Sequence, residues 1–281
     1  MKIGKSKIRQ IVSWFFALML TLMFFVLLTF LGLFLGYFRN QEIRNKISES
    51  SYYNKAYQQL EEDIQSIMTS YGMPSDLLQE VITLERVYVT GRNYVEHSLK
   101  GVEKEIPIEE VRKELDEVLT EHVISRGTEI TTEVRVGIDE CITHVLSRYQ
   151  QSIRLPFINE MIGYKHSISK IGMRVIPVAG VLALVLILLL LKIHPYKHQG
   201  VRYINYSVIA SSSLISIGSV WLLSLPFYQN IQVEPEHYSL FIKQHMSWSI
   251  KLYLILGIMG LVVGVTLFTL IGYMKRNITK K

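Results

Sequence analysis

Six of the eight histidines form two groups whose chemistry suits metal binding or proton exchange near neutral pH. His194 and His198 are four residues apart in a short basic segment, but Pro195 disfavours the regular helix that would bring them together. We therefore interpret both as loop residues. The other four are spread through the polar middle of the chain: His97, His122, His144 and His166. They would form a metal or pH-sensing site only if folding brought them together with acids such as Glu121 or Asp139.

Catalytic signatures are absent from the sequence. It contains no HExxH, GxSxG, P-loop, GxGxxG or CxxC pattern, so we predict a protein that is not an enzyme and has no cofactor. A membrane-embedded enzyme is kept as an alternative, in which His122, His144 and His166 would be the reactive residues. Cys141 is the single cysteine and cannot form a disulfide within the chain. Its helical spacing from Ile138 and Val145 predicts a small core residue.

Tyrosines are frequent in the polar middle of the chain, where their amphipathic rings are suited to contacts with a partner protein. Several fall on apolar helical stripes and are expected in a core. We predict that Tyr52, Tyr53 and Tyr94 are the exposed ones and that they bind a partner.

Four stretches are long and apolar enough to cross a bilayer. Ile11 to Phe38 contains 28 consecutive uncharged residues, too many for the apolar region of a cleaved signal peptide. The predicted spans are residues 11–38, 174–192, 203–228 and 249–274. Tyr228 is expected at a membrane interface. Small residues on these spans are predicted to pack helix against helix: Gly32, Gly36, Ser207, Ser211, Gly260 and Gly264.

The distribution of charge predicts the orientation. The net charge is +6, yet 22 of the 24 acidic residues lie between Glu42 and Glu160. Lysine and arginine concentrate in residues 1–10, 193–202 and 275–281, which the positive-inside rule places in the cytoplasm. We therefore expect a multi-pass cell (plasma) membrane protein with both termini cytoplasmic. The basic surplus is explained by this topology, so nucleic acid is not an expected partner.

Between the first two spans, residues 39–173 show apolar positions at alternating spacings of three and four, which predicts a helical bundle outside the cytoplasm. Ser75 is expected to cap one helix, Pro107 to begin another, and Thr131 or Thr132 to begin a third. Pro156 is expected to interrupt that third helix. Residues 229–248 are predicted to be an extracytoplasmic connection between the last two spans.

The predicted fold class is thus an all-α membrane protein with four transmembrane helices and an extracytoplasmic helical bundle inserted between the first and second. The predicted function is non-catalytic: the bundle binds a ligand or another membrane or extracytoplasmic protein, as an accessory, assembly or sensing subunit. The order of one span, a large outer domain and three further spans resembles, in topology, membrane subunits of the MacB and FtsX type. That resemblance implies an alternative function as a permease-like subunit of an ATP-driven mechanotransmission or export complex.

Overall fold

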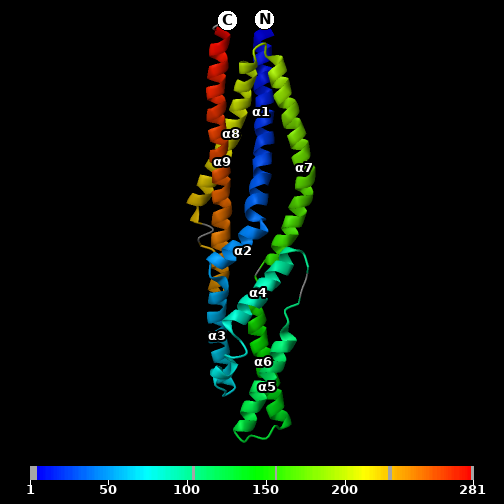
Figure 1. Ribbon diagram of the computed structural model, residues 1–281, viewed down its shortest axis with the longest axis vertical. Helices are drawn as coiled ribbons and strands as arrows, with labels where there is room; N and C mark the ends of the chain where they lie inside the picture. Colours follow the sequence, from blue (N-terminus) through cyan, green and yellow to red (C-terminus); the bar gives the residue numbers. More distant parts are fainter. Residues whose placement is uncertain (1–4, 103–104, 156, 227–229, 280–281) are drawn as a thin grey trace. The chain divides into compact units, whose positions relative to one another are not determined.

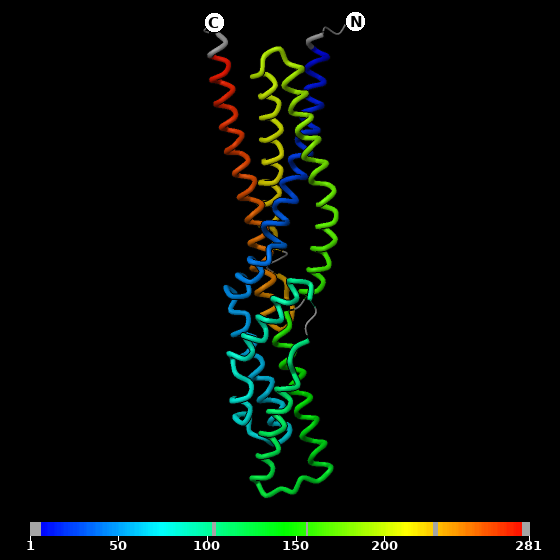
Figure 2. Tube along the Cα trace, turned by 45° about the vertical axis from the view of Figure 1, so that its right-hand side comes forward, coloured from blue at the N-terminus to red at the C-terminus, as the bar shows by residue number. Residues whose placement is uncertain are grey.

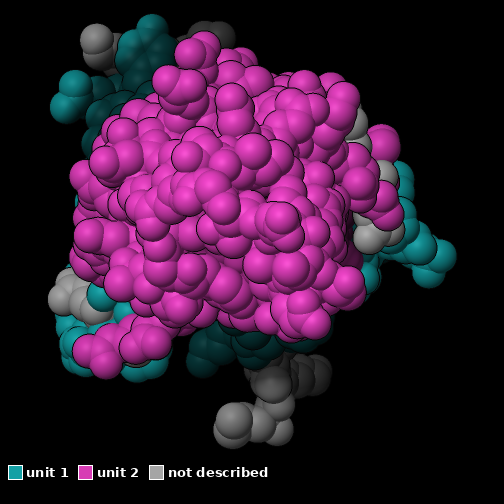
Figure 3. Space-filling view, turned by 90° about the horizontal axis from the view of Figure 1, so that it is seen from below, with its two compact units in different colours: residues 1–43, 165–231, 243–281 teal, residues 44–164, 232–242 magenta. Residues whose placement is uncertain are grey.

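The computed structural model describes residues 5–102, 105–155, 157–226 and 230–279, and within these residues it contains helices and turns but no β-strand. The chain divides into two compact units, coloured separately in Figure 3. Unit 1 consists of residues 1–43, 165–231 and 243–281, and unit 2 consists of residues 44–164 and 232–242. The expected helix break at Pro156 and the expected interfacial ring of Tyr228 lie outside the described residues.

Unit 1 is built from long helices that run side by side (Figures 1 and 2). They are α1 (Lys5–Gly32), extended by the π-helical turn η1 (Leu33–Tyr37), and most of α7 (Ile158–Ile193), α8 (Lys197–Ser224) and α9 (Glu236–Thr279). Each of these four is long and apolar enough to cross a membrane, which confirms the expected number of candidate spans.

Two of these helices are longer than the predicted spans. Helix α7 begins at Ile158, well before the expected boundary at residue 174. Helix α9 begins at Glu236, so the segment 229–248 is not simply a loop, because its second half already belongs to this helix. The uncharged part of α9 is the stretch 252–274, between Lys251 and Lys275, and this is the part suited to hydrocarbon.

The core of unit 1 lies where α1, α7 and α8 meet. Ala17 and Leu20 of α1 pack with Ala183 and Leu190 of α7 and with Tyr203 of α8. Two of these five side chains are alanine, which allows the helix backbones to approach closely. The start of α1, the turn between α7 and α8, and the end of α9 lie at the same end of unit 1 (Figure 1).

Unit 2 is a bundle of shorter amphipathic helices. They are α2 (Asn40–Glu49, of which the last six residues belong to this unit), α3 (Tyr52–Ser70), the 3₁₀ turn η2 (Ser75–Leu78), α4 (Leu84–Leu99), α5 (Ile108–Ser125) and α6 (Thr132–Ile153). Helix α6 packs against α3, α4 and α5, so it occupies the centre of the bundle.

Two of the predicted helix starts differ in outcome. Thr131 caps α6 as expected, with its hydroxyl accepting from the backbone N–H of Val134. Ser75, in contrast, is the first residue of the short turn η2, whose cap position is occupied by Pro74. The cap of α4 is Thr83, whose hydroxyl accepts from the backbone N–H of Arg86 at 3.1 Å. The helix expected to begin at Ser75 therefore begins at Leu84 instead.

Large side chains fill the interior of unit 2. The most deeply buried include Tyr52, Leu60, Leu115, Ile142 and Tyr149. Cys141 lies among them, fully buried, as predicted for a core residue, and burial raises the pKa of its thiol. Such burial of apolar area supplies the main free energy of folding for a bundle that has no disulfide to stabilise it.

Candidate functional site

The four histidines of the polar middle are not brought together, and two of them have local hydrogen-bond partners. His97 bonds through Nδ1 to the carbonyl oxygen of Asn93 at 2.8 Å, and Nδ1 of His144 lies 3.2 Å from the hydroxyl of Tyr71. His122 is half-buried on α5, and His166 lies in unit 1. Within the described residues, no three histidine, cysteine or acidic side chains are placed to hold a metal ion.

His194 and His198 also have different surroundings. His194 is buried, its Nε2 lies 2.9 Å from the hydroxyl of Ser13, and its ring stacks on Tyr203. His198 stacks on Tyr196 instead. His194 therefore contributes to packing between α1 and the start of α8, rather than forming a pair with His198.

Tyr52 and Tyr53 are interior residues, so the expectation that they are exposed is wrong. Tyr52 is 0% exposed and its hydroxyl donates to the carbonyl of Arg154 at 2.9 Å. Tyr53 is 3% exposed and contacts Gly91 so closely that an added Cβ there would lie 2.2 Å from the ring. Tyr94 is half-buried. Tyr52 and Tyr53 face the interior because the helix is interrupted at Ser51. The φ of 52° at Ser51 makes α3 begin with a different helical phase from α2.

Tyr52 is the centre of an aromatic cluster that includes residues from the beginning of α9. Its ring stacks on Tyr238 at 6.0 Å between centroids and meets His237 and Phe241 edge-on at 5.0 and 6.2 Å. The hydroxyl of Tyr238 donates to the carbonyl of Gln151 on α6 at 2.9 Å. Segment 232–242, which connects α8 to the spanning part of α9, is thereby built into unit 2.

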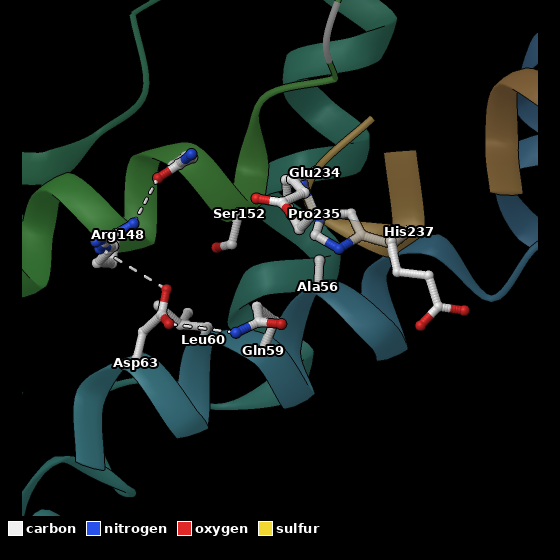
Figure 4. Close-up of a pocket in the computed structure, with 11 residues that line it drawn as sticks. Ala56, Gln59, Leu60, Asp63, Arg148, Ser152, Glu234, Pro235 and His237 are labelled. Carbon is white, nitrogen blue, oxygen red and sulfur yellow. Dashed lines mark hydrogen bonds and ion pairs between the residues drawn. The ribbon is translucent and has the colours of Figure 1, made fainter. Parts of the chain in front are cut away.

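Beside this cluster, unit 2 has a pocket of about 420 Å³ between α3, α6 and the segment that begins α9 (Figure 4). This volume is within the range of small-ligand sites. The lining residues are Ala56, Gln59, Leu60 and Asp63 of α3; Arg148, Gln151 and Ser152 of α6; and Glu234, Pro235, Glu236 and His237 of the connecting segment.

The wall contributed by α3 and α6 is organised by ionic and amide contacts. The carboxylate of Asp63 lies 3.8 Å from the guanidinium of Arg148 and accepts from Nε2 of Gln59 at 3.3 Å. Arg148 also donates to Oε1 of Gln151 at 3.3 Å (Figure 4). The only cation in the lining is therefore already shared between two acceptors.

The opposite wall combines two acids with a neutral imidazole. Glu236 lies 3.9 Å from Lys55, while burial and the charge of Lys55 lower the pKa of His237 to about 4. His237 is 3% exposed, and its buried Nε2 has no hydrogen-bond partner among the described residues. With three carboxylates and one guanidinium in the lining, the pocket is suited to a ligand group that is positively charged or rich in N–H donors.

Sequence reasoning missed this segment because it is short and lies between two spans. A signal was present: Tyr238 and Phe241 are three residues apart, on one helical face, just before Lys243. That spacing predicts a short amphipathic turn that must bury its apolar face. The pattern does not indicate where the face is buried, because its partner Tyr52 is far away in the sequence.

The predicted packing residues of the membrane helices lie at close contacts in unit 1. An added Cβ on Gly32 or Gly36 would approach Tyr253 or Leu252 of α9 to 2.2 or 2.9 Å. An added Cβ on Gly260 of α9 would lie 2.1 Å from Ser212 of α8, and an added Cβ on Gly264 would lie 2.6 Å from Ile209 of α8.

The hydroxyls of α8 act in two ways. Ser207 donates to the carbonyl of Ala17 on α1 at 2.7 Å, and so joins two helices. Ser211 donates to Val208 within its own helix, and therefore contributes its small size rather than a bond between helices.

Comparisons with protein-family models, with curated proteins and with solved structures find no match to the chain.

Proposed function

We propose that the chain is a non-catalytic integral membrane protein whose helical bundle, unit 2, lies outside the cytoplasm and binds a ligand or partner in the α3–α6 pocket. The observation that carries this proposal is the construction of one pocket wall from residues 234–237, which connect two candidate membrane helices. A binding event at this wall would act directly on the first turn of α9. An accessory or sensing role follows from that connection.

The orientation is supported by the arrangement of charges within unit 1. Basic residues flank the start of α1, the α7–α8 turn and the end of α9, which all lie at one end of the unit. Under the positive-inside rule this end is cytoplasmic, and the acidic chain between α1 and α7 is exported. Four crossings keep both termini on the same side.

The ligand class follows from the lining. Asp63, Glu234 and Glu236 supply carboxylates, and His237 supplies a neutral ring with an unpartnered nitrogen. A basic side chain of a partner protein, or a small amine, would be attracted to this wall. Binding that altered the Lys55–Glu236 contact would change the start of α9, a helix that continues without interruption to Thr279.

The binding proposal is tested by placing a photo-crosslinking amino acid at Gln59, on the pocket rim, in the full chain in its native membrane. The matched control places the same photo-crosslinking amino acid at Asn54, which is exposed on α3 but does not line the pocket. We expect an adduct from Gln59 that the charge-reversing change Glu236→Lys weakens, and none from Asn54. Equal adducts at both positions, or no adduct at Gln59, would contradict the proposal.

The orientation is tested by cysteine labelling. Cys141 is buried, so Lys113→Cys on α5 and Lys197→Cys at the start of α8 would each introduce one reactive thiol. A membrane-impermeant maleimide added to intact cells is expected to label the first and not the second. Labelling of Lys197→Cys alone would place the bundle in the cytoplasm and overturn the assigned topology.

A further inference from the structure

A second cavity, of about 430 Å³, lies inside unit 1 and is lined by all four candidate spans. Helix α1 with η1 contributes leucine and phenylalanine side chains from the stretch 24–35. Helix α7 contributes Ile176, α8 contributes Val208, and α9 contributes Val263. The cavity volume is in the range of sites that bind small molecules in proteins.

The walls of this cavity are almost entirely hydrocarbon. The only hydroxyls in the lining belong to Ser211 and Ser212, and Ser211 already donates to the carbonyl of Val208 at 3.0 Å. A buried water molecule needs two to four polar partners, which this lining does not offer. An empty cavity would leave the lining side chains without dispersion contacts. Hydrocarbon is therefore the filling that the walls favour.

The cavity is accessible from the side of the helix bundle. Three of its lining residues are also exposed at the surface of unit 1: Leu31 and Leu35 at 42% each and Val263 at 52%. These residues lie in the apolar parts of α1, η1 and α9, which a bilayer would surround with lipid tails. The class of molecule that meets this opening is thus a membrane lipid.

Two irregularities of the helix backbone border the cavity. The π-helical turn η1 carries Phe34 and Leu35 of the lining, and Pro177, inside α7, follows Ile176 of the lining. A π turn or an internal proline locally disturbs regular helix packing, and π turns occur frequently at functional sites. Next to the cavity α7 approaches η1 and α1 closely, since a Cβ on Gly172 would lie 3.1 Å from Phe34 and 3.3 Å from Phe30. The cavity therefore coincides with specific backbone features in a unit that otherwise packs tightly.

We infer that this cavity is a binding site for one acyl chain of a bilayer phospholipid, which enters past Leu31, Leu35 and Val263. The site is independent of the acidic pocket in unit 2, and it requires only that unit 1 spans a membrane. Bound in this way, the chain supplies the dispersion contacts that the protein leaves unfilled between its four helices.

The test uses the full chain in proteoliposomes that contain a phosphatidylcholine with a photoactivatable diazirine on one acyl chain. Leu28→Trp and Val208→Phe fill the cavity from two different helices. Their matched controls, Leu22→Trp and Val220→Phe, make the same changes at exposed positions outside the lining. We expect labelling of the peptides that contain the lining residues to fall about tenfold in the filling variants. This is the effect expected if the acyl chain loses the burial of roughly two methylene groups. The controls should retain the labelling.

The unmodified protein provides a measurement that does not depend on the folding of a variant. As the probe fraction rises, labelling at Leu28 and Val208 should saturate, because one site fills, whereas labelling at the exposed Leu184 and Leu188 of α7 should keep rising. Proportional labelling at all four positions would overturn the inference. Stronger saturable labelling by a photoactivatable polyprenyl phosphate than by the phospholipid would overturn the assignment to an acyl chain.

Discussion

Unit 1 and unit 2 use large and small side chains in opposite places. In unit 2 large side chains such as Tyr52 and Tyr149 fill the interior, and charged residues cover the helices. In unit 1 glycines bring α9 close to α1 and α8, and Ser207 of α8 bonds to α1, while Leu188 and Phe268 point outward at 65% and 69% exposure. Water drives apolar groups into the interior of unit 2. Lipid around the candidate spans of unit 1 would provide no such drive, so close backbone approach would have to hold those helices together.

The polar contacts between helices also differ between the two units. Unit 1 joins helices through a serine hydroxyl bonded to a backbone carbonyl, as Ser207 does with Ala17. Unit 2 joins α4 to α5 through a two-pronged ion pair between Arg86 and Glu114, at a surface that water can reach. The first kind of contact is protected from solvent, and the second is screened by it.

The largest effect is expected from removing an interior ring of unit 2. Tyr52→Ala should destabilise the bundle by about 3–5 kcal/mol, because it leaves a large cavity. Tyr52→Phe, which keeps the ring and loses the hydroxyl that donates to the carbonyl of Arg154, should cost about 1 kcal/mol. Amide hydrogen exchange of α3, measured on the full chain in nanodiscs, checks both. Phe268→Ala, at the outer face of unit 1, should leave the exchange rates unchanged.

Acid should destabilise unit 2 through His237. Its pKa is lowered to about 4 in the folded chain, so the unfolded chain, with the ordinary pKa of 6.5, binds the proton first as the pH falls. The loss of stability caused by His237 is therefore absent above about pH 6.5 and reaches roughly 3 kcal/mol near pH 4. The groups around His237 are Tyr52, Lys55, Glu236 and Tyr238.

The control for this pH effect is His237→Phe, which keeps an aromatic ring and removes the titrating nitrogen. Thermal unfolding of the full chain between pH 7 and 4 should show a smaller acid-induced loss in the variant. If both proteins lost stability equally, the carboxylates of unit 2 rather than His237 would account for the acid sensitivity.

A smaller effect is expected from enlarging a glycine between membrane helices. Gly260→Val would force α9 away from Ser212, and overpacking of this kind costs about 1–3 kcal/mol. Gly272→Val makes the same change on the same helix where nothing lies within 4 Å. Resistance to unfolding in detergent should fall for the first variant only. Equal behaviour would mean that close approach of α8 and α9 does not stabilise unit 1.

The smallest effect is expected at the Arg86 ion pair. Arg86→Gln removes the contacts to Glu114, but solvent reaches both groups, so the cost should be about 1 kcal/mol or less. The carboxylate of Glu114 has its pKa lowered by Arg86, so the contribution is present at neutral pH and is lost as the pH falls. Thermal unfolding at low and high salt checks this, since the difference between the two proteins should shrink when salt is added.

The four candidate membrane helices could be predicted because each carries its own signal, a long uncharged run that needs no information about neighbours. The cap at Thr131 was likewise local. Ser75 was misread because its residue type suits a helix cap, whereas the chain forms only a 3₁₀ turn there and restarts at Thr83. Residue type is a good predictor of a chain reversal but a poor predictor of the residue at which the next helix begins.

The candidate pocket could not be predicted, because it depends on contacts between distant parts of the sequence. Tyr52 meets Tyr238 and His237 only after the segment following α8 has docked on α3 and α6. The positive φ of Ser51 separates α2 from α3 and changes the helical phase between them. Helical spacing carried over from α2 therefore does not predict that Tyr52 and Tyr53 face the interior.

Cys141 has a practical consequence for anyone who labels this protein. The only sulfhydryl in the chain is fully enclosed, and its raised pKa keeps it protonated at neutral pH. Alkylating reagents should therefore find no native target while the bundle is folded. Fluorophores or spin probes attached at engineered positions would report without background, and modification of Cys141 itself would mark the moment at which the bundle opens.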